Sequence, residues 1–237
     1  MMAVEVSQLQ VEFSDFTLGP VDIRVEDGIV AILGPNGSGK TTLLRAINGL
    51  VPRAKGRATF GDADLMGRDP AGLRWCAYVP DGDEMLFSEL SLHEFWAFYT
   101  DIRERSFGDD RQELLTRAYD FAERLSLSPG RVRLGEFSQG MRRKAQLITG
   151  LMTEPKVLMV DEPQNGLDFV SSHEVRRILG EVRDAGNIVI MSNHDLDSVA
   201  RVADSIVVLR EGAVVGRSSA RFASADECAS YVAAYFA

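Results

Sequence analysis

A glycine-rich segment between an apolar run and an amphipathic run constrains this fold more than any other part of the chain. The segment reads GPNGSGKT over residues 34–41 and fits the pattern G-x-x-x-x-G-K-[ST]. The apolar run IVAIL at 29–33 precedes it, and Leu43, Leu44 and Ile47 follow it at helical spacing. This order predicts a strand, a loop and a helix, the opening unit of an α/β fold.

The same loop is suited to bind a nucleoside triphosphate. Its glycines let the backbone turn N–H groups inward, and the N-terminus of the following helix adds the positive end of a dipole. Lys40 supplies a point charge to the β- and γ-phosphates, and the Thr41 hydroxyl can bind magnesium. The expected cradle consists of Gly34, Pro35, Asn36, Gly37, Ser38, Gly39, Lys40, Thr41 and Thr42.

Short runs rich in β-branched residues alternate with helical patterns along most of the chain. Strands are predicted at 29–33, 76–80, 156–160, 187–191 and 205–209. Several are apolar on both faces, as expected for a parallel sheet covered by helices. The alternation in VEVSQLQVEF and VDIRVEDG instead favours half-exposed antiparallel strands near the N-terminus. We therefore predict an α/β fold with a mostly parallel sheet core and an antiparallel β flank.

Residues 82–137 interrupt this rhythm with helical patterns only. Ser91 and Glu94 have the spacing of a capping box, and a second amphipathic stretch follows the first. The apolar residues of the first helix recur at helical spacing: Leu92, Phe95, Trp96, Tyr99 and Ile102. We predict a helical subdomain at about 82–137, inserted into a core formed by 1–81 and 138–237. A plain pair of packing helices would give the same periodicity.

Two adjacent carboxylates follow the strand predicted at 156–160. Asp161 and Glu162 carry like charges, so a cation is expected near them. Because side chains alternate in direction at a strand end, the two acids are expected to point to different places. Asp161 can bind the magnesium held by Thr41, and Glu162 can orient the attacking water or act as its general base. Two solvated acids in a turn before Pro163 are the alternative.

Five segments, taken in order, resemble the motifs of the ATP-binding subunits of ABC transporters, and the resemblance covers nearly the whole chain. GPNGSGKTT is similar to their Walker A motif, and VLMVDEP is similar to their Walker B motif. NGLD at 165–168 resembles the D-loop, SNHDL at 192–196 the switch-histidine loop, and EFSQGMRRK at 136–144 the signature sequence. The resemblance implies one ABC-type P-loop NTPase domain that uses ATP and Mg2+ and drives a membrane permease by hydrolysing ATP.

The predicted signature helix offers a second phosphate site. Ser138 is a natural N-cap, and its hydroxyl and the N–H groups near Gly140 can bind a phosphate there. The resemblance implies that this phosphate belongs to ATP held by an opposed subunit, a second copy or a paralogue, so that an ATP-bound dimer has two composite sites. It also implies that Asp168 belongs to the nucleotide site and that Lys40 and His194 are catalytic with Glu162. A plain helix cap and a hydrogen-bonded surface histidine are the alternatives.

Some positions depart from the family pattern. Gln139 and Met141 replace a glycine and a glutamine of the common signature, and this S-x-G-M form resembles the branch with ABC-2-type exporters. Asp81 stands where the family usually has the Q-loop glutamine, and its carboxylate can still bind magnesium or water. An aromatic ring is expected to stack on adenine, and either Phe13 or Phe16 could supply it.

Charge and composition limit the partners and the location. The formal net charge of −9 argues against a nucleic-acid binder that works through a broad basic face. The two cysteines fit a reducing compartment, and the N-terminus lacks the features of a secretory signal. No stretch approaches the roughly 20 apolar residues of a membrane span. We expect a cytoplasmic protein that reaches the inner face of the membrane only through its permease.

Much of the negative charge lies in one segment. Residues 81–137 contain thirteen acidic and seven basic residues, so their net charge of −6 is two thirds of the −9 of the chain. The segment is also rich in large apolar residues. We therefore predict an acidic, partly apolar surface, including Asp83 and Glu84, that binds a cytoplasmic helix of the permease. A soluble single-cassette ABC ATPase, for example in cofactor assembly, is one alternative function, and a P-loop kinase is another.

Overall fold

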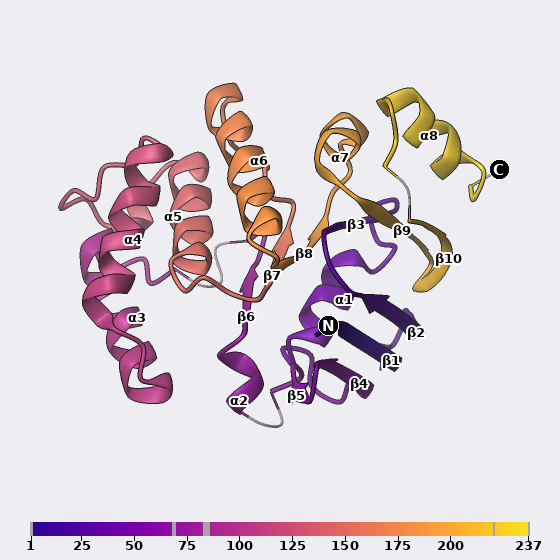
Figure 1. The fold of residues 1–237 in the computed structure, drawn as a ribbon, viewed down its shortest axis with the longest axis horizontal. Helices are drawn as coiled ribbons and strands as arrows, with labels where there is room; N and C mark the ends of the chain where they lie inside the picture. Colours follow the sequence, from indigo (N-terminus) through magenta and orange to yellow (C-terminus); the bar gives the residue numbers. More distant parts are fainter. Residues whose placement is uncertain (1, 68–69, 83–85, 220, 237) are drawn as a thin grey trace.

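The structure is a computed structural model that describes residues 2–67, 70–82, 86–219 and 221–236 (Figure 1). Its strands are β1 Val4–Glu12, β2 Thr17–Val25, β3 Ile29–Leu33, β4 Lys55–Phe60, β5 Ala63–Asp64, β6 Cys76–Val79, β7 Val157–Asp161, β8 Ile188–Ser192, β9 Ser205–Arg210 and β10 Ala213–Ser218. Its α-helices are α1 Lys40–Ile47, α2 Pro70–Leu73, α3 Leu92–Phe107, α4 Arg111–Arg124, α5 Gln139–Leu151, α6 Phe169–Asp184, α7 Leu196–Val202 and α8 Ala225–Ala233. A short 3-10 helix spans Leu134–Glu136.

The larger sheet is the predicted parallel core. Its strand order is β10-β9-β3-β8-β7-β6, and all neighbours are parallel except β9 and β10. Every residue of β3, β7 and β8 is buried, as required of central strands with both faces covered. Because these strands are parallel, their carboxyl ends meet at one edge of the sheet, where an α/β fold normally binds its ligand.

Strand β10 is an element for which the sequence analysis gave no prediction. It pairs antiparallel with β9 at the end of the sheet, and its sequence AVVGRS is mostly exposed or half-buried. An edge strand of this kind lacks the continuous apolar run that identifies the central strands. Gly216 accommodates the Tyr235 ring, since a β-carbon there would lie 2.4 Å from a ring atom.

The smaller sheet confirms the predicted antiparallel flank. It has the order β2-β1-β4-β5, with antiparallel pairing throughout. Helix α1 lies between the two sheets, because Leu43, Leu44 and Ile47 pack in one core with β1, β2, β4 and one face of the larger sheet. The sheets therefore hold the start of α1 in place from two sides.

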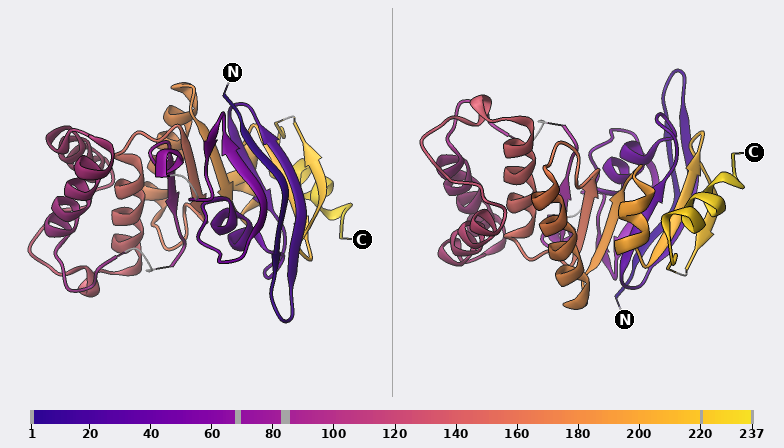
Figure 2. Two further views of the ribbon diagram at one scale, coloured as in Figure 1. Left: turned by 90° about the horizontal axis from the view of Figure 1, so that it is seen from below. Right: turned by 90° about the horizontal axis from the view of Figure 1, so that it is seen from above.

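Helices α3 and α4 lie beside α5, at the opposite end of the molecule from the antiparallel sheet (Figure 2). The predicted capping box is confirmed: the Ser91 N–H donates to Glu94 at 2.8 Å, and the Ser91 hydroxyl accepts from the Glu94 N–H. Division of the chain into a core and a subdomain at 82–137 stays a prediction. Within the described ranges, every helix is too short or too polar to traverse a lipid bilayer. Both cysteines are free thiols.

Ile102 recurs at helical spacing with the apolar residues of α3 but is not buried with them. Ile102 is 42% exposed, whereas Leu92 and Trp96 are fully buried. In the last turns of the helix the buried place goes to Arg103, which is 6% exposed and forms an ion pair with Asp109 at 2.7 Å. Apolar spacing alone could not predict that an arginine with a nearby carboxylate would displace an isoleucine.

Candidate nucleotide site

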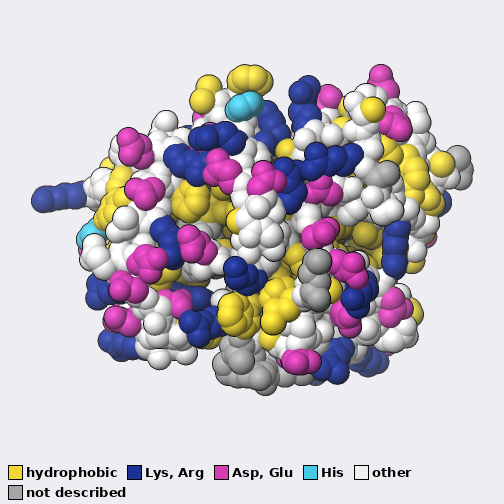
Figure 3. Space-filling view, viewed as in Figure 1, with side chains coloured by type: hydrophobic (Ala, Val, Ile, Leu, Met, Phe, Trp, Pro, Cys, Tyr) yellow, Lys and Arg dark blue, Asp and Glu magenta, His cyan; other side chains and the backbone are white. Residues whose placement is uncertain are grey.

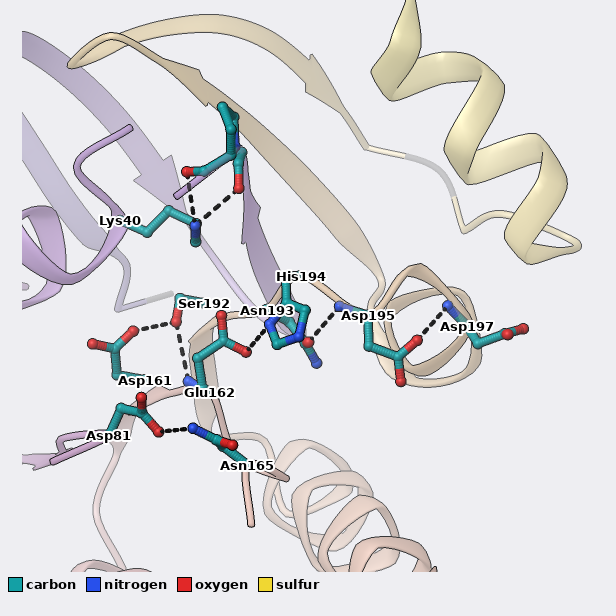
Figure 4. Close-up of polar contacts among 12 residues, drawn as sticks. Lys40, Asp81, Asp161, Glu162, Asn165, Ser192, Asn193, His194, Asp195 and Asp197 are labelled. Atoms are coloured by element: carbon teal, nitrogen blue, oxygen red, sulfur yellow. Dashed lines mark hydrogen bonds and ion pairs between the residues drawn. The ribbon is translucent and has the colours of Figure 1, made fainter. Parts of the chain in front are cut away.

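Lys40 begins α1, directly after the glycine-rich loop that follows β3. Its side chain is buried, and its ammonium donates hydrogen bonds to the carbonyl oxygens of Gly34 at 2.9 Å and Pro35 at 3.1 Å (Figure 4). Gly39 has a φ of 103°, a left-handed conformation that glycine adopts at little cost, and this conformation turns the loop into the helix. Neutral carbonyls bind an ammonium less strongly than a phosphate does, so a phosphate can replace them as the partner of Lys40.

The start of α1 presents unpaired hydrogen-bonding groups. No side chain among the described residues caps its first turn, so the first N–H groups of the helix lack an internal partner and carry the positive end of the helix dipole. The Ser38 hydroxyl is buried and has no hydrogen-bond partner among the described residues. The other predicted cradle residues lie at the mouth of the loop: Pro35, Asn36, Gly37 and Thr41 are exposed, and Thr42 is half-buried. These features are typical of an anion-binding helix N-terminus.

Asp161 ends β7 and is 1% exposed. Ser192 lies opposite it at the end of β8 and donates its hydroxyl hydrogen to Asp161 Oδ1. Oδ2 of the same carboxylate is buried without a hydrogen-bond partner in the described chain. An unpaired buried carboxylate oxygen is costly, and a hard divalent cation is the ligand it suits best. Asp161 therefore fits Mg2+, and binding of the same ion by the Thr41 hydroxyl stays a prediction.

No group of three or more carboxylate, histidine or cysteine side chains within the described residues is placed to hold a metal ion. A magnesium ion at Asp161 would therefore depend on hydroxyl, phosphate and water oxygens for its remaining ligands. Such dependence on substrate phosphates is usual for Mg2+ in proteins that bind nucleotides.

Glu162 follows Asp161 but turns away from it. Its φ of 49° is left-handed, which is uncommon for a residue with a side chain, and its N–H donates to the Ser192 hydroxyl at 3.0 Å. Glu162 Oε2 lies 2.8 Å from His194 Nδ1 (Figure 4). Burial raises the pKa of the Glu162 carboxyl, while His194 and Lys40 act in the opposite direction. A carboxylate with a raised pKa is a better proton acceptor for an attacking water.

Asp81 lies in the loop after β6 and is exposed. Its Oδ1 accepts a hydrogen bond at 2.8 Å from the side-chain amide of Asn165, a residue of the predicted D-loop (Figure 4). The structure thus brings the Asp81 loop to the segment that follows Glu162. A metal-binding role for Asp81 stays a prediction.

The predicted N-cap role of Ser138 is confirmed. Its hydroxyl accepts a hydrogen bond from the Met141 N–H at 3.2 Å, at the first turn of α5. Gly140 packs closely against the D-loop, since a β-carbon on it would lie 2.7 Å from the carbonyl oxygen of Gly166. Among the described contacts, no hydrogen bond joins Ser138 or Gly140 to the loop at 34–42. The structure therefore does not bring these two predicted sites together within one chain.

Asp168 caps the next helix of the site, α6. Its carboxylate accepts hydrogen bonds from the N–H and the hydroxyl of Ser171, both at 2.8 Å, and these bonds lower its pKa to about 2. Lys144 of α5 lies 3.5 Å from the same carboxylate. The D-loop is thus linked to α5 by one ion pair and by the close approach of Gly140. Whether Asp168 contacts a nucleotide stays a prediction.

The two aromatic candidates lie at the turn between β1 and β2. The Phe13 N–H donates to the Phe16 carbonyl at 2.8 Å, and the two ring centroids are 6.3 Å apart. Phe16 is half-buried against the phosphate loop, since a β-carbon on Gly39 would lie 2.8 Å from its Cζ. Phe13 is 50% exposed. Phe13 is therefore the more exposed of the two rings, and which of them stacks on adenine stays a prediction.

Arg143 is a site residue that the sequence analysis missed. It is 2% exposed, lies on α5, and donates to the main-chain carbonyls of Asp161 at 2.6 Å and Glu162 at 3.0 Å, and also to that of Pro80. Burial lowers its pKa to about 10, and nearby acids, Asp81 first among them, oppose this effect. The signal was the cation expected beside two adjacent acids. The run MRRK contains three candidates, and only the docking of α5 selects the middle one.

Comparisons with known proteins agree with this geometry. Residues 18–165 match the family model described as ABC transporter. Over 90% of its length the chain is 32% identical to the sulfate/thiosulfate import ATP-binding protein CysA of Xylella fastidiosa (strain Temecula1 / ATCC 700964). Over 84% of its length it is 30% identical to the ABC transporter ATP-binding protein NatA of Bacillus subtilis (strain 168). The chain spans 62% of the length of that CysA and 80% of that of NatA.

Solved structures show the same fold. An ATP-binding subunit of an ABC transporter superposes with a TM-score of 0.81 and 26% identity, covering 97% of this chain and 99% of that one. An ATP-binding cassette of an ABC transporter in its ADP conformation gives a TM-score of 0.74 and 25% identity, with 98% and 95% coverage. The predicted fold class is therefore confirmed over nearly the whole chain.

Proposed function

The chain belongs to the ABC transporter family, and from this premise we propose that it binds ATP with Mg2+ and hydrolyses ATP to drive a membrane permease. The observation that carries the proposal is the gathering of three features at one edge of the larger sheet. They are the Lys40 ammonium held by loop carbonyls, the unpaired oxygen of Asp161, and the contact between Glu162 and His194. Each corresponds to one need of phosphoryl transfer: binding, charge neutralisation and activation of water.

The residues would act as follows. The β- and γ-phosphates of ATP bind in the loop at 34–42. There they replace the carbonyls of Gly34 and Pro35 as the hydrogen-bond acceptors of the Lys40 ammonium. Bound Mg2+ supplies positive charge against the phosphate oxygens, and Thr41 and Asp161 would hold it. Glu162 accepts a proton from the attacking water, and His194 orients the Glu162 carboxylate through the 2.8 Å contact.

A second subunit completes the proposed site, either a second copy or a paralogue. Ser138 and the N–H groups near Gly140 would contact the γ-phosphate of ATP bound by that subunit. Phe169 and Val170, at the start of α6, are 82% and 74% exposed. Figure 3 shows hydrophobic side chains projecting at the upper edge of the molecule, over α6. Apolar side chains this exposed favour a covering partner beside the D-loop.

The proposed permease surface lies beside the Asp81 loop. A groove of about 510 Å³ is lined by residues of 86–90 and by Phe98. Phe87 and Phe98 are 55% and 47% exposed, with ring centroids 5.7 Å apart in an edge-to-face arrangement. A cytoplasmic helix of the permease could place an apolar side chain in this groove, against the two rings. Asp83 and Glu84, expected to add negative charge here, lie outside the described residues.

Several parts of the proposal rest on the sequence. The exporter branch is supported by Gln139 and Met141 alone, and the sulfate relatives are named as import proteins. The cytoplasmic location at the inner face of the membrane, the attachment through a permease and the absence of a nucleic-acid partner follow from charge and family. The choice of Phe13 over Phe16 as the ring that stacks on adenine follows from its greater exposure.

The test of the proposed function is ATP hydrolysis by the purified chain with Mg2+, measured as release of inorganic phosphate. We expect hydrolysis by the wild-type chain, and at most residual hydrolysis by Asp161→Asn. A folded wild-type chain that binds no ATP and releases no phosphate, alone and with its permease, would contradict the proposal.

A further inference from the structure

Arg143 binds the main chain of the two adjacent acids, Asp161 and Glu162, through their carbonyl oxygens. Its guanidinium bridges the loop after β6, through Pro80, and the end of β7, through Asp161 and Glu162. The fork-shaped arrangement of guanidinium donors allows one side chain to bind several carbonyls at fixed angles. Arg143 itself belongs to α5. It therefore joins three segments that are distant in the sequence.

A second side chain of α5 strengthens the same connection. Gln146, one turn further along the helix and 4% exposed, donates to the carbonyl of Gly82 in the Asp81 loop. Its carbonyl oxygen lies 3.5 Å from Arg143 Nη1. Two buried side chains thus bind α5 to the loop and to the end of β7. If α5 moved without the loop and the end of β7, several buried hydrogen bonds would be lost, so we expect the three segments to move together.

Arg143 differs from the other buried arginine of the helical region. Arg103 pairs directly with the Asp109 carboxylate and stacks on the Phe107 ring, an ordinary arrangement for a buried charge. The hydrogen bonds of Arg143 instead go to main-chain carbonyls and to the side-chain oxygen of Gln146. The carboxylates of Asp161 and Glu162 contact Ser192 and His194. The Glu162 carboxylate is thereby left available for the reaction.

The Glu162 turn needs such a restraint. Its left-handed φ of 49° is unfavourable for a residue with a β-carbon and persists only when its surroundings hold it. The Ser192 hydroxyl fixes the N–H side of the turn at 3.0 Å, and Arg143 fixes the carbonyl side at 3.0 Å. The direction of the Glu162 side chain therefore depends on both contacts.

We propose that Arg143 is a positioning residue for ATP hydrolysis, which holds the Glu162 carboxylate in place and links it to α5. The proposal rests on the proposed function and deepens it. Ser138 caps helix α5, and Gly140 lies in its first turn. A phosphate of the opposed subunit that shifts this helix would therefore shift Glu162 of the same chain. Arg143 thereby connects the second phosphate site to the base that acts at the first.

The test compares Arg143→Gln and Arg143→Lys with the matched control Arg103→Gln, in the full chain. For Arg143→Gln we expect kcat to fall about ten- to hundredfold, since small displacements of a catalytic group have effects of this order. The Kd for ATP, measured by equilibrium titration, should stay within about twofold of wild type, because Lys40 and its loop are unchanged. Arg143→Lys should recover part of the lost kcat, because its ammonium keeps the charge and can still donate to main-chain carbonyls. Recovery should stay incomplete, because lysine lacks the fork that reaches Pro80 from Nη1 and Asp161 and Glu162 from Nη2.

The control separates positioning from stability. Arg103→Gln should lower the Tm, since it removes a buried ion pair, and keep kcat near wild type. A folded Arg143→Gln or Arg143→Lys chain with wild-type kcat would overturn the proposal. So would a loss of kcat in Arg103→Gln that matches the loss in Arg143→Gln at equal Tm. Failure of the wild-type chain to hydrolyse ATP would instead overturn the proposed function, and this inference with it.

Discussion

Two helix N-termini, those of α1 and α5, are the proposed phosphate sites of this molecule. They differ in whether a side chain caps the first turn of the helix. Helix α1 begins after Gly39, and no side chain caps it. Helix α5 begins after Ser138, whose hydroxyl already accepts the Met141 N–H. The first N–H groups of α1 are therefore available to an anion, whereas one N–H of the first turn of α5 already donates to the Ser138 hydroxyl. We therefore expect the site at α1 to bind ATP within one chain, and the site at α5 to bind a phosphate only in a dimer.

The lysines beside the two helices differ in the same sense. Lys40 is held by two neutral carbonyls, at 2.9 and 3.1 Å. Lys144 lies 3.5 Å from the carboxylate of Asp168. A phosphate that binds Lys40 replaces neutral carbonyls, whereas one that binds Lys144 has to compete with the Asp168 carboxylate. We therefore propose that α1 provides most of the affinity for ATP, and that α5 contributes to catalysis only when two subunits associate.

The largest effect is expected from a substitution that removes the base and leaves both phosphate sites intact. In Glu162→Gln, hydrolysis should slow about hundred- to ten-thousandfold, the usual effect of losing a positioned base, while ATP binding persists. The ATP-bound dimer should then accumulate and be visible by size-exclusion chromatography. Glu181→Gln, an acid on the far part of α6, is the control and should hydrolyse ATP normally. Loss of Mg-ATP affinity in Glu162→Gln, with retention in Asp161→Asn, would mean that the roles of the two acids are reversed.

The next effect tests the site at α1. Lys40→Ala removes the side-chain cation of the loop, so the affinity for ATP should fall about ten- to hundredfold, as expected for a hydrogen bond to a charged group. Isothermal titration calorimetry on the folded variant measures this directly. Lys156→Ala removes a lysine at the opposite end of β7 and should bind ATP as wild type does. Normal affinity in Lys40→Ala would remove the assignment of the loop.

The smallest effect tests the site at α5. Ser138→Ala removes the cap and should lower the free energy of unfolding by about 1 kcal/mol, with unchanged ATP affinity in the isolated subunit. Hydrolysis should fall about tenfold, because one hydrogen bond to the γ-phosphate of the opposed subunit is lost. Denaturant unfolding and phosphate release are the two measurements. Equal loss of ATP affinity in the isolated subunits of Ser138→Ala and Lys40→Ala would erase the distinction between the two helices.

The sequence predicted the strand, loop and helix of the proposed α1 site correctly because they are contiguous. A buried strand, a glycine-rich loop and an amphipathic helix follow one another over 29–47, so local rules are sufficient. The capping box at Ser91 and the N-cap at Ser138 are equally local, and both are confirmed. The different directions of Asp161 and Glu162 followed from position at a strand end, which is also a local property.

The sequence could not predict features that depend on how distant segments dock. Arg143 became the cation behind the acids only because α5 packs against the end of β7. Arg103 displaced Ile102 because Asp109 lies within reach. Phe13 and Phe16 were equivalent until the hairpin turn placed Phe16 against Gly39. In each case the outcome depends on a tertiary contact, and neither periodicity nor motif contains that information.

The central claim is that a complete site takes α1 from one chain and α5 from another, and mixing two inactive variants tests it most directly. Lys40→Ala keeps an intact α5 but has a defective loop, whereas Ser138→Arg keeps the loop but blocks α5. Each variant alone should release little phosphate. When the two are mixed with ATP and Mg2+, half of the composite sites of a mixed dimer become intact, so hydrolysis should reappear. Activity in Ser138→Arg alone, or a mixture no more active than the sum of its parts, would contradict the account.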